Sequence, residues 1–138
     1  MPLRPAYLAL ALRTPIGRHR GSLASVRTDD LAAHLVREAI VRHPFLATSV
    51  DQVVFGATNQ AGEDNRNVAR MAALLAGLPY EVPALTVNRL CGSGLEAVCD
   101  AARRIATNDA DVVLAGGVES MTRAPYVFGK ADEAFARV

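Results

Sequence analysis

Residues 87–98 read VNRLCGSGLEAV and decide the fold of this 138-residue chain. The apolar run Ala84–Val87 predicts a strand, and the run Ser93–Thr107 predicts a helix. A strand that passes through a short glycine turn into a helix is typical of a βαβ unit. The stretch therefore predicts an α/β domain, with Cys91 in the turn between the two elements.

The same alternation of strands and helices extends outward. Ala6–Leu12 is a continuous apolar run, which predicts a strand covered on both faces; it is too short for a signal peptide and no clear cleavage site follows it. The other predicted elements are a helix that starts near Asp29 and stops before Pro44, a strand at Gln52–Phe55, a helix at Asn67–Ala76 and a strand at Asp111–Ala115. Alternating elements predict a mostly parallel sheet, and ligands of such sheets lie beyond the carboxyl ends of the strands.

Composition excludes several classes of protein. The net charge is +1, which gives no electrostatic basis for binding nucleic acid. No segment reaches the ~18 apolar residues of a membrane-spanning helix. Hydrophobic residues make up 51% of the chain and the mean hydropathy is +0.16. These values fit a helix-covered sheet or a domain that expects a large partner surface.

Cys91 is the strongest candidate for a chemical role. The free N–H groups and positive dipole end of a helix N-terminus stabilise a thiolate, which is the reactive form of cysteine. Gly92 and Gly94 allow close backbone approach, Ser93 is expected to cap the helix, and the backbone N–H groups are candidates to hold an oxyanion. The alternative from the residues alone is that Cys91 is a small buried hydrophobic residue at a turn.

The other cysteine and the histidines give Cys91 no obvious partner. Cys99 falls with Leu95, Val98, Ala102 and Ile105 on one helical face, which predicts core packing. The two cysteines lie about 12 Å apart along the predicted helix, too far for a disulfide, and their spacing does not suggest zinc. The chain therefore reads as reduced and cytoplasmic. None of the three histidines is marked as a general base: His19, His34 and His43.

Two polar stretches leave alternatives open. Residues 62–67, GEDNRN, fit a capped helix start with Asn65 or Asn67 as the cap, or a specificity or interface loop. Residues 116–121, GGVESM, fit a tight turn after a strand, and glycines alone do not make a phosphate loop.

Taken together, these motifs resemble the thiolase family. Residues 87–105 are similar to the acyl-enzyme signature of thiolases, with Cys91 at the nucleophile position. Three further stretches resemble the same family: RTPIG at 13–17, NRNVAR at 65–70 and GGVESM at 116–121. The stretch 62–71 is similar to thiolases of the 3-oxoadipyl-CoA type. Ketoacyl synthases, an alternative, usually carry several serines or alanines around the cysteine.

The resemblance implies one half of a layered αβαβα fold. Residues 1–118 would be the N-terminal α/β domain, and residues 119–138 the start of a loop region or second element. The family's second half supplies a Gly-His-Pro histidine, a second cysteine in a Cys-x-Gly-Gly-Gly run and an Asn-Glu-Ala-Phe run, and none of these runs occurs here. The helix after Cys91 would be buried between the two halves.

The resemblance also implies the chemistry. Cys91 would carry an acyl thioester in transfer between 3-oxoacyl-CoA and CoA, with coenzyme A as co-substrate and neither a metal nor a redox cofactor. Without the second cysteine and the histidine, this chain alone is expected to turn over very slowly or not at all. Expected partners are a second copy or a complementary C-terminal half. The alternative from another class is a non-catalytic truncated or split-gene product that acts only through association.

Overall fold

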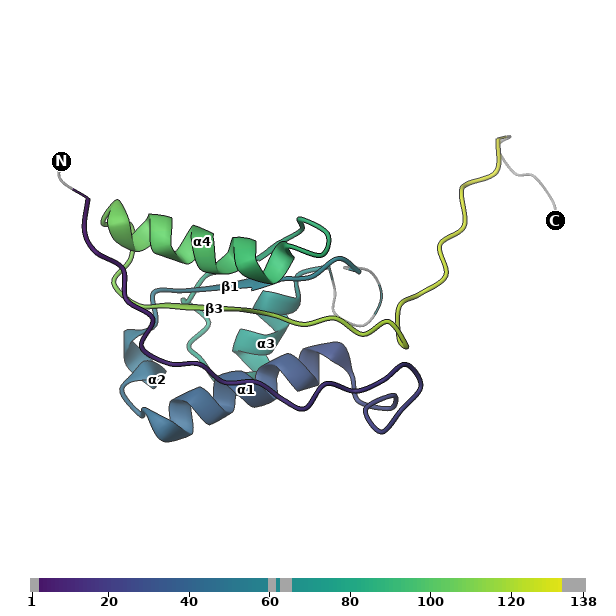
Figure 1. Ribbon diagram of the computed structural model, residues 1–138, viewed down its shortest axis with the longest axis horizontal. Helices are drawn as coiled ribbons and strands as arrows, with labels where there is room; N and C mark the ends of the chain where they lie inside the picture. The colour runs from purple at the N-terminus through teal and green to yellow at the C-terminus, as the bar shows by residue number, and fades with distance from the viewer. Residues whose placement is uncertain (1–2, 60–61, 63–65, 133–138) are drawn as a thin grey trace.

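Strand β1 (Gln52–Gly56) lies at the centre of a parallel three-stranded sheet of order β2-β1-β3, in the computed structural model of residues 3–59, 62 and 66–132. β2 (Ala84–Val87) and β3 (Val113–Gly117) flank it. Helix α4 (Ser93–Ala106) covers one face of the sheet, while α1 (Thr28–Arg42) and α3 (Val68–Ala76) cover the other (Figure 1). A short helix, α2 (Leu46–Ser49), leads into β1 and was not predicted. The predicted α/β class with a parallel sheet is confirmed.

The main core lies between the sheet and the pair α1 and α3. Val53 of β1 is fully buried at its centre. The two helices face each other through small side chains, which lets them approach closely: Ala32, Ala33 and Val36 on α1, and Ala69, Ala72 and Ala73 on α3. The core therefore depends on side-chain size as much as on hydrophobicity.

Asn67 joins α3 to β2. Its Oδ1 accepts hydrogen bonds from the backbone N–H of Arg70 (3.1 Å) and from the hydroxyl of Thr86 (2.9 Å), and its Nδ2 donates to the carbonyl of Ala84 (3.1 Å). Of the two caps that the sequence left open, Asn65 and Asn67, it is Asn67 that caps this helix. Residues 63–65 of the same stretch lie outside the described residues, so its interpretation as a specificity loop stays a prediction.

The predicted strand at Ala6–Leu12 is wrong. The segment is extended, but it forms no ladder with β3, and Tyr7 and Leu8 are 80% and 88% exposed. It is anchored near its start, where the Arg4 N–H donates to the carbonyl of Ala106 (3.1 Å), and Leu12 packs against the core. An apolar run becomes a buried strand only where both of its faces are covered. Within this run, the described part of the chain covers little except the side chain of Leu12.

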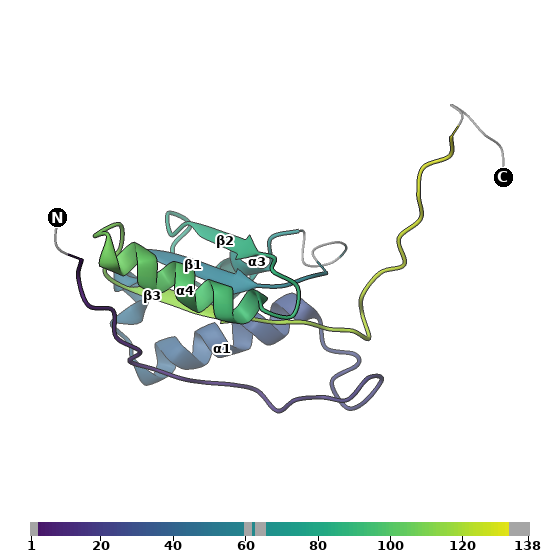
Figure 2. The same cartoon turned by 45° about the horizontal axis from the view of Figure 1, so that its top comes forward.

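The predicted core face of α4 is also wrong. The side chains that α4 buries are small, Ser93, Ala97 and Ala101, while Leu95 is 70% exposed and Cys99 is half-buried. Helix α4 lies along β1 and β3 (Figure 2). The strand ends beneath it carry glycines, so only small residues fit between the helix and the sheet. The larger apolar residues of α4 are left on its sides and outer face.

Two glycines of the sheet, Gly56 and Gly117, set the distance between α4 and the sheet. A Cβ at Gly56 would lie 2.2 Å from the carbonyl carbon of Ser93, a distance that no real contact reaches. A Cβ at Gly117 would lie 2.9 Å from the Gly56 carbonyl oxygen and 3.3 Å from Gly94 Cα. Gly116 and Gly117 belong to β3 itself, where they pair with Phe55 and Gly56, and not to the tight turn that the sequence suggested. The Phe55 ring leaves little room for a side chain at Gly116, and α4 leaves little at Gly117.

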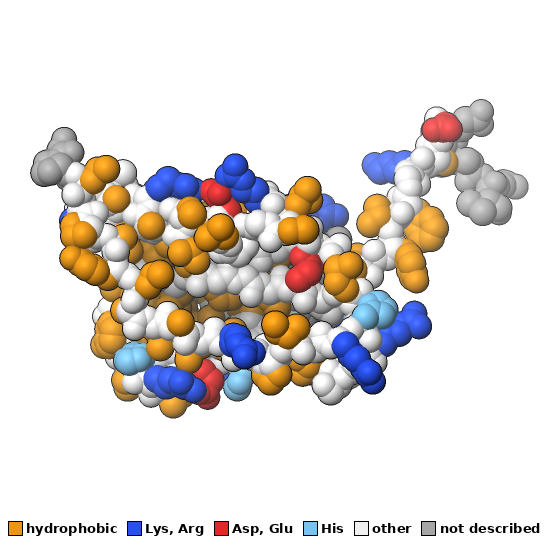
Figure 3. All heavy atoms as spheres, in the orientation of Figure 1, with side chains coloured by type: hydrophobic (Ala, Val, Ile, Leu, Met, Phe, Trp, Pro, Cys, Tyr) orange, Lys and Arg blue, Asp and Glu red, His pale blue; other side chains and the backbone are white. Residues whose placement is uncertain are grey.

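After β3 the chain leaves the body of the domain. Residues 118–132 contain no helix or strand, and from about residue 124 they run away from the sheet (Figure 1). The side chains of Tyr126, Val127 and Phe128 are 85–89% exposed and form an apolar cluster on this arm (Figure 3). The predicted domain boundary after residue 118 stays a prediction.

We expect Gly56→Ala to destabilise the protein by about 1–3 kcal/mol or more, because the added methyl group overlaps the backbone of Ser93. Urea unfolding measures the change. The matched control is Gly94→Ala, whose Cβ meets nothing within 4 Å and whose helical position favours Ala by roughly 1 kcal/mol. Equal stability of the two variants would contradict the close packing of α4 on β1.

Candidate functional site

Cys91 lies in a tight turn between the end of β2 and the start of α4. Its side chain is exposed. Cys91 and Cys99 are both free thiols, so the prediction that they form no disulfide is confirmed. The preceding residue, Leu90, has φ = +50°, in the left-handed region that a branched side chain rarely adopts. Such strain persists only where neighbouring contacts hold it, and it is common at functional sites.

Hydrogen bonds hold Leu90 from both sides. Its N–H donates to Oδ1 of Asn88 (3.0 Å), and its carbonyl accepts from the Ser93 hydroxyl (2.6 Å). The Ser93 hydroxyl also accepts from the N–H of Arg89 (2.8 Å), and Ser93 is only 4% exposed. These three bonds fix the backbone immediately before Cys91.

The prediction that Ser93 caps α4 is wrong. The N-cap position is Gly92, with no side-chain cap, and Ser93 is the first helical residue. Its hydroxyl is turned back to the cysteine turn because the backbone N–H of Arg89 and carbonyl of Leu90 are both within reach. Ser93 therefore braces the turn rather than the helix.

The turn also uses some of the amides that were candidates to hold an oxyanion. The N–H of Gly92 donates to the carbonyl of Arg89 (3.1 Å), and the N–H of Ser93 donates to the carbonyl of Leu90 (3.0 Å). The first-turn N–H groups of Gly94 and Leu95 have no carbonyl partner within the helix, as at any helix start. The positive end of the α4 dipole therefore faces the Cys91 turn.

Charged side chains of the turn and of α4 form a chain of ion pairs. The Arg89 guanidinium donates to Glu96 (2.7 Å), and Arg103 donates to the other oxygen of the same carboxylate. Hydrogen bonds from Arg103 and then from Arg89 lower the pKa of Glu96. The carboxylate nearest the start of α4 is thus paired with two cations, which limits its repulsion of a thiolate at Cys91.

The sequence reasoning missed a second polar cluster, at the ends of β1 and β3. The Glu119 carboxylate accepts hydrogen bonds from the N–H and hydroxyl of Thr58 and from the N–H and side-chain amide of Asn59. Partial burial raises the pKa of Glu119, but these hydrogen bonds outweigh it and hold the pKa below its usual value. An acid two residues past a strand end, in a parallel sheet, was the signal available in the sequence.

The histidines do not contact Cys91. His34 lies on α1 and His43 follows it, on the face of the sheet opposite α4, where His43 packs edge-on against Phe45. His19 lies in the exposed loop before α1. Among the described side chains, none forms a hydrogen bond with the Cys91 thiol.

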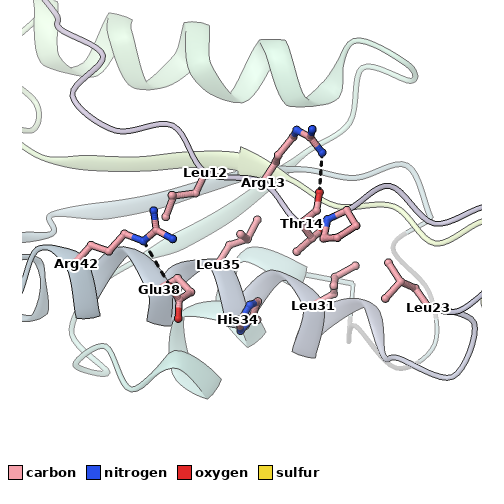
Figure 4. Close-up of a pocket in the computed structure, with 10 residues that line it drawn as sticks. Leu12, Arg13, Thr14, Leu23, Leu31, His34, Leu35, Glu38 and Arg42 are labelled. Atoms are coloured by element: carbon pink, nitrogen blue, oxygen red, sulfur yellow. Dashed lines mark hydrogen bonds and ion pairs between the residues drawn. The ribbon is translucent and has the colours of Figure 1, made fainter.

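A hollow of about 400 Å³ lies between the N-terminal segment and α1 (Figure 4). Arg42 pairs with Glu38 (3.5 Å), and the Arg13 side chain donates to the carbonyl of Thr14 (3.3 Å). The hollow lies on the α1 side of the sheet and does not adjoin Cys91. It is lined by Leu12, Arg13, Thr14, Pro15, Leu23, Leu31, His34, Leu35, Glu38 and Arg42.

Residues 3–59, 62 and 66–132 contain no group of three His, Cys, Asp or Glu side chains placed to hold a metal ion. In the same ranges, no helix has both the length and the apolar character needed to cross a membrane.

Comparison with known proteins gives consistent matches. The model for the thiolase N-terminal domain matches residues 6–135. The chain is 60% identical over 136 residues to the 3-oxoadipyl-CoA/3-oxo-5,6-dehydrosuberyl-CoA thiolase of Escherichia coli, covering 98% of this chain and 34% of that protein. It is 62% identical over 135 residues to a beta-ketoadipyl-CoA thiolase of Pseudomonas knackmussii, covering 97% and 34%.

A solved structure agrees with the fold. The acetyl-CoA acetyltransferase of Bacillus anthracis superposes with a TM-score of 0.87 at 36% identity, covering 94% of this chain and 32% of that one. The chain therefore spans about a third of the length of the relatives that it matches.

We expect Ser93→Ala to destabilise the protein by about 1–3 kcal/mol, because it leaves the Arg89 N–H and the Leu90 carbonyl without their partner. Urea unfolding gives the stability, and amide hydrogen exchange at Arg89 should become faster. Ser22→Ala, in an exposed loop, is the matched control and should stay within about 0.5 kcal/mol of wild type. Unchanged exchange at Arg89 would show that Ser93 does not brace the turn.

Proposed function

This chain belongs to the thiolase family, in which it corresponds to the N-terminal domain, and we propose that it carries the nucleophile of acyl transfer between 3-oxoacyl-CoA and CoA. One observation carries the proposal. Cys91 is an exposed free thiol on a strained turn at the N-terminus of α4, at the carboxyl edge of a parallel sheet. This is where thiolate is stabilised and where ligands of such sheets bind.

The proposed reaction has two halves. The Cys91 thiolate attacks the 3-keto carbon of a 3-oxoacyl-CoA, and the carbon–carbon bond to C2 breaks. The acyl group remains on Cys91 as a thioester, and the electron pair leaves as the enolate of acetyl-CoA, which takes up a proton. The thiol of a second CoA then attacks the thioester, the bond from the acyl carbon to the Cys91 sulfur breaks, and the shortened acyl-CoA is released while Cys91 takes up the proton of the CoA thiol. The same thioester serves the reverse, condensing direction.

The described residues support the first half better than the proton transfers. They supply the nucleophile, the helix dipole and the first-turn amides of α4, which favour negative charge. The general acid and base of the reaction are proposed to come from the part of a thiolase that lies beyond this sequence. A well-placed acid or base contributes roughly 10²–10⁴-fold in rate, so this chain alone should be acylated far more readily than it turns over.

The names of the relatives suggest the substrate. Several are thiolases of 3-oxoadipyl-CoA, also called beta-ketoadipyl-CoA, at 54–62% identity. We propose the same substrate class here, a 3-oxoacyl-CoA whose acyl chain ends in a second carboxylate. The residues described do not include the whole stretch 62–71 that carries this resemblance, so the choice rests on sequence similarity.

We expect brief incubation with acetoacetyl-CoA to add one acetyl group to the protein, detected by intact mass. The adduct should disappear in Cys91→Ala and persist in the matched control Cys99→Ala, since Cys99 is half-buried along α4. 3-Oxoadipyl-CoA should acylate Cys91 faster than acetoacetyl-CoA does. An adduct that survives Cys91→Ala would contradict the assignment. The absence of any adduct would favour a non-catalytic product.

We further propose that the outer face of α4 packs against another chain or a complementary second half, because Leu90 and Leu95 are 71% and 70% exposed beside the candidate nucleophile. Light scattering at micromolar concentration should detect self-association of this chain, and Leu95→Gln should weaken it. Leu74→Gln, on α3 across the sheet, is the matched control. A monodisperse monomer would count against this interface.

A further inference from the structure

Four hydrogen bonds tie the Glu119 carboxylate to the loop after β1. One oxygen accepts from the N–H of Thr58 (2.8 Å) and from the Thr58 hydroxyl. The other accepts from the side-chain amide (3.0 Å) and the N–H (3.3 Å) of Asn59. Glu119 follows β3 and Thr58 follows β1, so the carboxylate clamps two adjacent strand ends together.

The clamp continues toward Cys91. The carbonyl of Thr58 accepts a hydrogen bond from Nδ2 of Asn88 (3.3 Å), at the end of β2. Oδ1 of the same Asn88 accepts from the N–H of Leu90 (3.0 Å), the strained residue before Cys91. A continuous set of contacts therefore crosses all three strand ends, from Glu119 through Thr58 and Asn88 to the cysteine turn.

We propose that Glu119 is a positioning residue for Cys91: it fixes the Thr58 loop, which orients Asn88, which in turn holds Leu90 in the conformation that presents the thiol. The inference rests on the proposed function of Cys91 as nucleophile. Glu119 acts through other residues and does not touch the thiol.

Two other roles for Glu119 fit the contacts less well. An ion-pair role is not supported, because the donors to Glu119 among the described residues are the neutral groups of Thr58 and Asn59. A role as general base is disfavoured because both oxygens are already occupied by donors and the pKa is lowered. A carboxylate with several neutral donors is suited to fixing backbone, since charge-assisted bonds are stronger than neutral ones.

The test compares Glu119→Gln with the matched control Glu81→Gln, in the complete protein that the gene encodes. Gln keeps one oxygen acceptor but directs an amide group at donors that need an acceptor. Glu81 is exposed and lies before β2, at the opposite end of the sheet. The readouts are the acylation rate of Cys91 with acetoacetyl-CoA, the KM for that substrate, and amide hydrogen exchange at Leu90.

We expect Glu119→Gln to lower the acylation rate tenfold or more, as misplacement of a reacting group does, with little change in KM. Exchange at the Leu90 amide should become faster, and Glu81→Gln should match wild type in every readout. Asn88→Ala should slow acylation similarly, and the double variant should be no slower than Asn88→Ala alone, because both residues act in one series. Additive losses would overturn the proposal.

The outcomes separate this proposal from the proposed function. Suppose that wild type is acylated, and that Glu119→Gln has the wild-type acylation rate and the wild-type exchange at Leu90. This result would overturn the role of Glu119 and leave the proposed function standing. If wild type forms no thioester, the assignment of Cys91 as nucleophile fails. Hydrogen exchange at Leu90 then decides whether Glu119 positions the turn. Faster exchange in Glu119→Gln keeps Glu119 as the residue that positions this turn, and unchanged exchange removes that role too.

Discussion

The approach of α4 to the end of β1 is the constraint on which the rest of the site depends. Gly56 has no side chain, so the backbone of Ser93 can lie directly against it. This contact brings the N-terminus of α4 to the carboxyl edge of the sheet, next to the ends of the neighbouring strands. A larger residue at Gly56 would lift the helix, and the cysteine turn that joins β2 to α4 would have to move with it.

Once α4 is placed, the short link between Val87 and Ser93 has little freedom. It must reverse direction within five residues, and the left-handed conformation of Leu90 is how it does so. Asn88 and Ser93 stabilise that conformation: Asn88 accepts a hydrogen bond from the N–H of Leu90, and Ser93 donates one to its carbonyl. The strain at Leu90 is thus a consequence of packing, and the strained turn leaves the thiol of Cys91 exposed.

Local sequence signals predicted the elements that depend on neighbours in the chain. Ala84–Val87 was predicted with its observed bounds, and Asn67 was one of two predicted caps for α3, because caps and strand ends are decided within a few residues. Ser93 was wrongly predicted as a cap because two groups only three and four residues before it, the Leu90 carbonyl and the Arg89 N–H, hold its hydroxyl instead. The errors at Ala6–Leu12 and the α4 face have another cause, because each depends on what lies across space: a covering layer, or a glycine beneath the helix. Glu119 was missed for the same reason, since its partners are about sixty residues away.

The position of Cys91, the proposed nucleophile, and its activation are separate properties of this domain. The position depends on the close backbone approach at Gly56, on the strained turn, and on the hydrogen bonds that the Asn88 and Ser93 side chains make with it. The described residues place His34 and His43 across the sheet from Cys91, so they do not supply a base. The paired Arg89 and Glu96 leave little net charge at the turn, and the helix dipole remains as the local influence that favours thiolate. Under the proposed function, a partner that supplies a base would approach the exposed side of Cys91, where Leu90 and Leu95 present an apolar surface.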